Sequence, residues 1–184
     1  MAKVTHGPIV SEARGKAAGL VYTKSRGGNV AKALSLTPPV VAATDGCALL
    51  TSIDLTVPVG SNYHPPFDKH LYDNGGMHSD SVNNSRITIR KAGVYLITAA
   101  PTFYGPADEL IQTYVWKNGT TGIQFTSTQT RTGYFCTPTM AFCVHLAVND
   151  YLELLIYIPA GGSPVIWSHY QNSPIFGAQQ LTAA

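Results

Sequence analysis

The sequence predicts an all-β protein, built as an antiparallel sandwich or barrel, and three observations lead there. Short runs that alternate polar and apolar residues recur about every 8 to 12 residues from Cys47 onward, without a helical stretch. Strong turn signals such as Asn118-Gly119 stand between these runs. The 17 Gly and 12 Pro residues are spread along the chain, which argues against long helices.

The composition excludes several protein classes. Charged residues make up 12% of the 184 residues, against about 25% in typical soluble domains, while 45% are hydrophobic. The chain is therefore not a disordered protein, a coiled coil or a charged helical bundle. No apolar run approaches the roughly 20 residues that span a bilayer, and no apolar segment follows the N-terminus, so we expect neither a membrane span nor a secretory signal.

Charge and composition divide the chain into three predicted parts. Residues 1–35 are Gly-rich and carry six bases and one acid, a net charge of +5, and we interpret them as a basic N-terminal anchoring arm. Residues 36–46 contain Pro38-Pro39 and are expected to form a stiff linker. Residues 47–184, with a net negative charge, are expected to form the folded domain.

The sequence of the arm is compatible with two alternative local structures. A short helix beginning at Ser11 is weakened by Gly15 and Gly19, and the alternative is a strand at residues 19–24 followed by a turn at residues 27–29. Since the arm has one aromatic residue, it cannot bury much apolar surface alone. We expect it to be extended and to gain structure on a partner.

About nine or ten short strands are expected after the linker. They fall at residues 48–57, 67–72, 86–91, 93–99, 111–117, 121–126, 139–147, 151–158, 164–168 and 175–181. Gly93 is expected where a side chain would clash at the entry to a central strand. The predicted core of the sandwich contains the large residues Phe67, Tyr95, Trp116, Leu152 and Phe176.

The predicted strand at 151–158 is apolar on both faces. Leu152, Leu154 and Ile156 share one face, and Leu155 lies on the other with Tyr151, Glu153 and Tyr157. A strand of a sandwich usually has one solvated face. The pattern predicts that the outer face of this strand contacts another subunit.

Several motifs in order resemble the C1q/TNF-like jelly roll. Leu55–Ala99 contains Phe-Asp, Tyr-Asp before glycines, Arg-Ile-Thr-Ile and Ala-Gly-Val-Tyr, and it resembles the first half of that fold. Val115–Ile123, His145–Tyr157 and Ile175–Leu181 resemble its central hairpin, penultimate strand region and closing strand. The resemblance covers residues 47–184 and implies an antiparallel jelly-roll sandwich that forms a homotrimer.

The first 30 residues resemble the N-terminal segment of certain tailed-bacteriophage virion proteins, in which a Gly-rich stretch leads into an element like Val21-Tyr22-Thr23-Lys24. This resemblance implies a virion protein assembled in the cytoplasm of a bacterial host. The expected role is a trimeric capsid decoration or cement protein, bound to the major capsid protein or another virion protein through residues 1–35. The alternative is a tail or head fibre module that recognises glycans on the host surface.

The arm's expected contact with the particle uses its charged residues and its tyrosine. These anchoring residues are Lys3, Arg14, Lys16, Tyr22, Lys24, Arg26 and Lys32. One aromatic residue is few for nucleic-acid binding, which needs stacking platforms, so a protein partner is preferred. The tyrosines Tyr63, Tyr134 and Tyr170 are candidates for stacking on sugars, which keeps the glycan alternative open.

The sequence predicts neither a catalytic site nor a cofactor. It lacks the HExxH, GxSxG, GxxxxGK[ST] and GxGxxG motifs. A metal site could be drawn from His64, His70, Asp73 and His78, or a calcium site from Asp68, Asp73 and Asp80, but neither set has a recognised spacing, and loop residues are the preferred interpretation. Asp108-Glu109 is expected at a solvated loop tip.

The three cysteines, Cys47, Cys136 and Cys143, are odd in number and irregularly spaced, which indicates reduced, partly buried thiols. A Cys136–Cys143 disulfide would require both residues to lie on paired strands.

Overall fold

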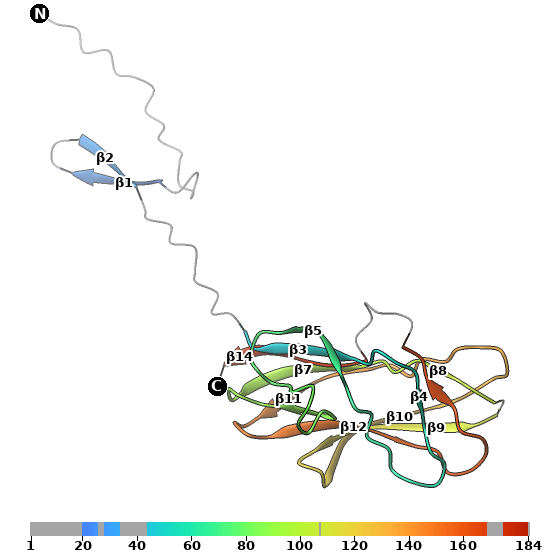
Figure 1. Ribbon diagram of the computed structural model, residues 1–184. Coiled ribbons are helices and arrows are strands. Elements are labelled where there is room, and N and C mark those ends of the chain that lie inside the picture. The colour runs from blue at the N-terminus through green and yellow to red at the C-terminus, as the bar shows by residue number, and fades with distance from the viewer. Residues whose placement is uncertain (1–19, 26–27, 34–43, 107, 169–174, 184) are drawn as a thin grey trace, which may run out of the picture. The chain divides into compact units, whose positions relative to one another are not determined.

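The computed structural model describes all of the chain except residues 1–19, 26–27, 34–43, 107, 169–174 and 184 (Figure 1). The chain divides into two units, residues 1–42 and residues 43–184. Each is described by itself, and we call residues 43–184 the body.

The first unit contains one antiparallel hairpin. Strand β1 (Leu20–Ser25) pairs with β2 (Gly28–Ala33), from Leu20 opposite Ala33 to Ser25 opposite Gly28. The strand predicted at 19–24 is present, but the second strand begins at Gly28, where the sequence predicted a turn. The predicted helix at Ser11, residues 36–43 of the linker, and the anchoring residues Lys3, Arg14, Lys16 and Arg26 lie outside the described residues.

The body is all-β in its described part. Its strands are β3 (Gly46–Leu50), β4 (Leu55–Thr56), β5 (Lys69–Asp73), β6 (Arg86–Thr88), β7 (Gly93–Ala99), β8 (Phe103–Tyr104), β9 (Leu110–Lys117), β10 (Thr121–Gln129), β11 (Met140–Leu146), β12 (Tyr151–Tyr157), β13 (Val165–Ile166) and β14 (Phe176–Ala183). The predicted strand at 48–57 is two strands, and β8 was not predicted.

Two antiparallel sheets form the layers of the body (Figure 1). One has the strand order β10-β9-β12-β6, and the other β11-β7-β14-β3-β5; a small sheet, β4-β13-β8, lies at one end. The last strand, β14, is inserted between β7 and β3, so the two ends of the body meet in one sheet. The all-β antiparallel architecture is confirmed.

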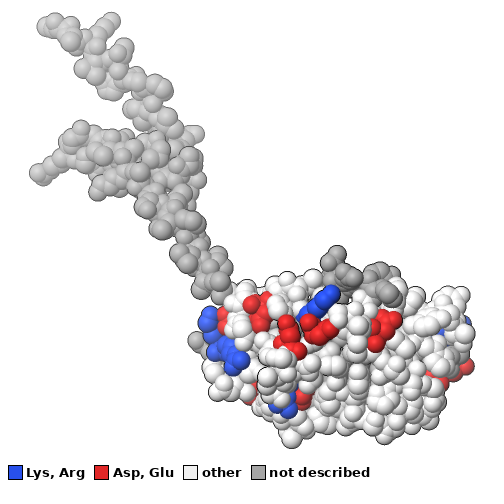
Figure 2. Space-filling view, viewed as in Figure 1, with Lys and Arg blue, Asp and Glu red and all other residues white. Residues whose placement is uncertain are grey.

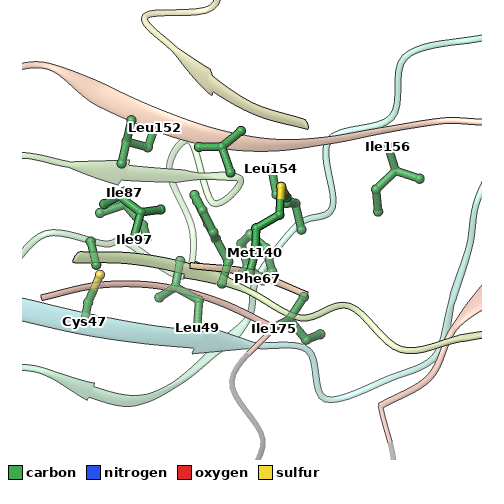
Figure 3. Packing of buried hydrophobic residues seen from close by; sticks show 14 of the residues in the cluster. Cys47, Leu49, Phe67, Ile87, Ile97, Met140, Leu152, Leu154, Ile156 and Ile175 are labelled. Carbon is green, nitrogen blue, oxygen red and sulfur yellow. The ribbon is translucent and has the colours of Figure 1, made fainter. Parts of the chain in front are cut away.

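Residues that alternate along the strands fill the space between the sheets. In Figure 3, Leu152 and Leu154 from one layer point toward Ile97, Met140 and Phe67. Phe67, Tyr95, Leu152 and Phe176 have no exposed surface, and the rings of Phe67 and Phe176 stack with centroids 6.1 Å apart.

The interpretation of Trp116 as a core residue is wrong. On β9 the inward positions are occupied by Ile111, Thr113 and Val115, all fully buried. Successive side chains of a strand point to opposite faces, so Trp116 lies on the outer face and is only partly buried. The prediction followed the size of the residue, whereas the position in the strand decides which face it occupies.

The interpretation of β12 is right about its faces and wrong about what covers them. Leu152, Leu154 and Ile156 face the core, yet Leu155 on the outer face is also only 1% exposed within the single chain. Leu155 lies opposite Tyr114 of β9, one of the large side chains on that face. The two-sided apolar pattern of β12 therefore does not require a second subunit.

Glu109 is buried rather than at a solvated loop tip. Its Oε1 atom accepts a hydrogen bond from the Gly162 N–H at 2.7 Å, and its own N–H donates to Thr130 Oγ1 at 3.0 Å. The carboxylate thus holds the glycine turn between β12 and β13. Its neighbour Asp108 is exposed and has a positive φ of 63°.

Candidate functional site

The most extended candidate surface is the outward side of the five-stranded sheet. Since Tyr95, Ile97, Phe176 and Ala178 point into the core, their neighbours in each strand face outward. On four strands these outward residues are Ala141, Cys143 and His145 (β11), Val94, Leu96 and Thr98 (β7), Gly177 and Gln179 (β14), and Gly46, Ala48 and Leu50 (β3). We call this set the uncharged face, because none of its residues is Asp, Glu, Lys or Arg.

The register places small residues side by side across the uncharged face. Thr98 lies opposite Ala141 on one side and Gly177 on the other, and Gly177 lies opposite Ala48. The exposed residues of this face are Thr98, Ala141, Cys143 and His145, and those partly buried are Val94, Leu96 and Gln179. Its remaining residues, Gly46, Ala48, Leu50 and Gly177, are already buried within the single chain, so the accessible part lies mainly on β7 and β11. A surface of small, uncharged side chains can pack closely against another flat surface without burying an unpaired charge.

The outer side of the opposite sheet is different, because it carries an ion pair. Arg86 on β6 donates to Glu153 on β12, and the Ser85 hydroxyl donates to the same carboxylate oxygen at 3.2 Å. The hydrogen bond to Glu153 raises the pKa of Arg86 above its ordinary value. Figure 2 shows charged side chains of both signs on the visible side of the body, with extensive uncharged surface beside them.

A cluster of aromatic rings lies near the small sheet. Phe135 stacks on Trp167, with ring centroids 4.2 Å apart, and its ring is 5.2 Å from that of Tyr104 on β8. Phe135 and Tyr104 are both about half exposed, and the adjacent Tyr134 is 68% exposed. This cluster was not predicted from the sequence, because its residues are far apart in the chain.

A second aromatic surface surrounds a shallow hollow of about 490 Å³ at the β9–β10 hairpin. Its lining residues are Tyr114, Trp116, Gly122, Ile123, Gln124 and Phe125. The rings of Tyr114 and Phe125, which are directly opposite in register, have centroids 4.8 Å apart. We call this site the hairpin hollow.

The three tyrosines suggested for sugar stacking have different environments. Tyr134 is exposed, whereas Tyr63 is partly buried, packs against the core and pairs through its backbone with Ile156. Burial raises the pKa of Tyr63. Tyr170 lies outside the described residues. The prediction of Tyr63 as an exposed ring for sugar stacking is therefore wrong.

Most of the candidate metal ligands have structural partners, and the exception is His64, whose buried Nδ1 atom has no hydrogen-bond partner among the described residues. Asp73 accepts hydrogen bonds from the backbone N–H groups of Met77 and His78 at 2.9 and 3.0 Å. His78 approaches the Arg86 carbonyl oxygen through Nδ1 at 2.9 Å, and Asp80 lies 3.4 Å from both His70 and His78. In the described part of the chain, no three His, Cys, Asp or Glu side chains are arranged to hold a metal ion.

Asp68 also has a local role. It accepts hydrogen bonds from the N–H and the hydroxyl of Ser52. Burial acts to raise the pKa of Asp68, but the hydrogen bonds from Ser52 outweigh it and hold that pKa below its ordinary value. This carboxylate stabilises the segment after β3.

All three cysteines are free thiols. Burial raises the pKa of the Cys47 thiol far above its ordinary value, so this residue is unreactive in the folded body. Cys143 is exposed on β11, and Cys136 is partly buried in an isolated bridge with Phe103.

Among the described residues, no helix is long and apolar enough to cross a membrane.

Solved structures share this architecture. A crystal structure of murine APRIL matches with a TM-score of 0.57 and 11% identity, covering 75% of this chain and 99% of APRIL. The body is a TNF/C1q-like jelly roll. The globular domain of zebrafish complement 1qA matches with a TM-score of 0.53 and 11% identity over 76% of this chain and 99% of its own. Eiger TNF from S. frugiperda matches with a TM-score of 0.52 and 13% identity over 77% and 94%.

At identities of 11 to 13%, the likeness to these structures shows the fold alone. No family model matches the sequence, and no curated protein matches it either. The jelly-roll prediction is thus confirmed, and the function has to be argued from the surfaces of this chain.

Proposed function

We propose that the chain is a non-enzymatic structural protein of a bacteriophage virion. In this proposal the body forms a homotrimer and residues 1–35 fasten the trimer to the particle, as a capsid decoration or cement protein. The observation that carries self-association is the uncharged face. The sequence resemblance to C1q/TNF-like proteins supports three as the number of copies.

The chemistry of the uncharged face suits association between copies. A sheet face that contacts only water is expected to carry charged side chains at many of its outward positions. Here the accessible outward positions, on β7 and β11 and at Gln179 of β14, hold small, apolar or neutral polar residues instead. Association removes this surface from water without leaving a charge unpaired.

The arm is suited to attachment because of its composition. Residues 1–35 carry a net charge of +5, whereas the rest of the chain is net negative. In a trimer, three such arms would act together, so that weak individual contacts give tight binding through their effective concentration. The sequence resemblance to tailed-phage proteins supports a partner on a virion.

Deletion of residues 1–35 tests this division of roles. The shortened protein should remain a folded trimer by circular dichroism and sedimentation, and should no longer co-sediment with virus particles that lack the protein. A matched full-length variant, with Lys3, Arg14, Lys16, Lys24, Arg26 and Lys32 changed to Gln, should bind more weakly at low salt. The difference from the unmodified protein should shrink at high salt, which screens the charges of the unmodified arm. Undiminished binding by the shortened protein would contradict the proposal.

A second candidate function is recognition of host glycans by a fibre module. The observation that favours it is the presence of exposed aromatic rings, around Phe135 and at the hairpin hollow. Aromatic rings with polar neighbours are common in recognition surfaces. A glycan array probed with the full chain separates the two candidates, because a purely decorative protein should bind none of the sugars.

A further inference from the structure

The hairpin hollow has an open indole ring as its central feature. Gly122 of β10 lies directly opposite Trp116 of β9 in the register. A Cβ atom at Gly122 would lie 3.5 Å from Trp116 Nε1 and 3.7 Å from Cδ1. Because glycine has no side chain, the space beside the indole and its N–H group is left clear.

The neighbours of Trp116 hold the ring in place without filling this space. His64 packs edge-on against the indole, with centroids 6.3 Å apart and an interplanar angle of 76°. Tyr114 and Phe125 form the next pair of rings on the same side of the hairpin. The hollow therefore combines a fixed indole with a second aromatic surface.

The polar groups of the hollow are all neutral. None of its six lining residues is charged, and its potential hydrogen-bonding groups are the Trp116 N–H, the Tyr114 hydroxyl and the Gln124 amide. The Tyr114 hydroxyl donates to Gln112 Oε1 at 3.1 Å, which leaves its lone pairs available. A charged ligand would find no counter-charge in this lining, so the chemistry favours a neutral one.

We propose that the hairpin hollow binds a neutral saccharide, with one face of a pyranose ring lying against Trp116. The C–H groups on that face of the sugar are apolar and fit an aromatic surface, while its hydroxyl groups can pair with the neutral donors and acceptors around the rim. The volume of about 490 Å³ lies within the usual range for small-ligand sites and can hold one or two sugar rings.

The hollow is better suited to this role than the cluster around Phe135. There the rings pack on one another, since Phe135 stacks on Trp167 and also contacts Tyr104. At the hollow, by contrast, Gly122 leaves the indole accessible. The inference gives a site to the glycan-recognition candidate and does not depend on trimer formation or on attachment to a virion.

Titration of the full chain with glucose, galactose, N-acetylglucosamine and lactose, measured by calorimetry, tests the proposal. At least one sugar should bind saturably. The variant Trp116→Ala should weaken that binding by about tenfold or more. Tyr72→Ala is the matched control, an aromatic truncation at an exposed position of β5 outside the hollow and outside the cluster around Phe135, and should bind like the unmodified protein.

A second variant keeps the test valid if Trp116→Ala fails to fold. Gly122→Val adds a side chain beside the indole, and its Cβ makes only ordinary contacts, so the hairpin should keep its stability. It should nevertheless weaken sugar binding as much as Trp116→Ala does. Hexaproline is the competing ligand, because proline-rich peptides also dock on aromatic grooves.

Three results would overturn the proposal. One is the absence of saturable binding by any of the four sugars. Another is equal sugar binding by the unmodified protein and a folded Gly122→Val variant. The third is binding of hexaproline at the hollow in place of the sugars. None of these results bears on the proposed trimer, whose failure would be seen in the mass of the protein.

Discussion

The Arg86 guanidinium donates a hydrogen bond from Nε to Glu153 Oε1 at 2.9 Å, and its Cζ atom lies 4.2 Å from the centre of the Tyr151 ring. Glu153 is only 6% exposed, and Arg86 is the cation that pairs with its carboxylate. Strand β6 has three residues, and through Arg86 it is tied to β12 by a side-chain contact as well as by the backbone ladder. The ion pair therefore fixes one edge of the four-stranded sheet.

Replacing Arg86 with Met should lower the free energy of unfolding by about 2 kcal/mol, because it leaves the Glu153 carboxylate buried without its cation. The loss is smaller than for a fully buried pair, since the Arg86 side chain is 34% exposed. Urea denaturation at one fixed protein concentration measures it. Arg90→Met, at an exposed position, is the control and should change stability by less than about 0.5 kcal/mol.

Gly93→Ala should lower the free energy of unfolding by about 3 kcal/mol. A Cβ atom at Gly93 would collide with the Thr182 carbonyl oxygen of β14, a backbone atom that cannot rotate away. The control is Gly122→Ala, also in a strand, where only ordinary contacts await the new atom. Thermal unfolding of both variants checks the prediction, and equal losses would contradict it.

The stabilising effect of Asp150 should depend on pH. Burial acts to raise the pKa of Asp150, but hydrogen bonds from Lys117, Asn118 and the Ala147 N–H outweigh it and hold the pKa below its ordinary value of 3.8. The carboxylate therefore stabilises the fold fully above pH 3.8, and this contribution is lost as the pH falls through the lower, folded-state pKa.

Comparison of the unmodified protein with Asp150→Asn, from about pH 6 to about pH 2, tests this linkage. The difference in free energy of unfolding should be largest at the upper end and should shrink in acid. Lys117→Met removes the ammonium partner, which lies 2.7 Å from Asp150 Oδ2, and should also reduce the pH dependence. A difference that stays constant with pH would show that the carboxylate has no such role.

The cysteines should report on the uncharged face. Cys143 is exposed in the single chain, whereas Cys47 is buried in the core. A thiol reagent should modify Cys47 only on unfolding. If the uncharged face is buried between copies, modification of Cys143 should be slow at high protein concentration and faster on dilution, as measured by mass spectrometry. Rapid modification at every concentration would argue against burial of β11.

The sequence predicted the strands well because a period of two is a local property. Gly93–Ala99 is a strand with the predicted bounds. The clash expected for a side chain at Gly93 is confirmed, since a Cβ atom there would collide with the Thr182 carbonyl oxygen. Trp116 was assigned to the core by its size, although Val115 occupies the inward position. This error follows from judging a residue without its neighbours in the sheet.

The surfaces could not be predicted, because they depend on contacts between distant residues. Glu109 was expected to be solvated, yet it binds the backbone of Gly162, 53 residues away. Leu155 was expected to need another subunit, yet side chains of the same body cover it. The uncharged face appears only once the register joins Thr98 to Ala141 and Gly177.

Analytical ultracentrifugation of the full chain at micromolar concentration tests self-association most directly. The proposal predicts a single species with three times the chain mass of 19.7 kDa. Thr98→Glu, which places a charge on the uncharged face, should shift the protein toward monomer, while Val82→Glu at an exposed position elsewhere should leave the trimer intact. A folded monomer for the unmodified chain, or a trimer unaffected by Thr98→Glu, would contradict the account.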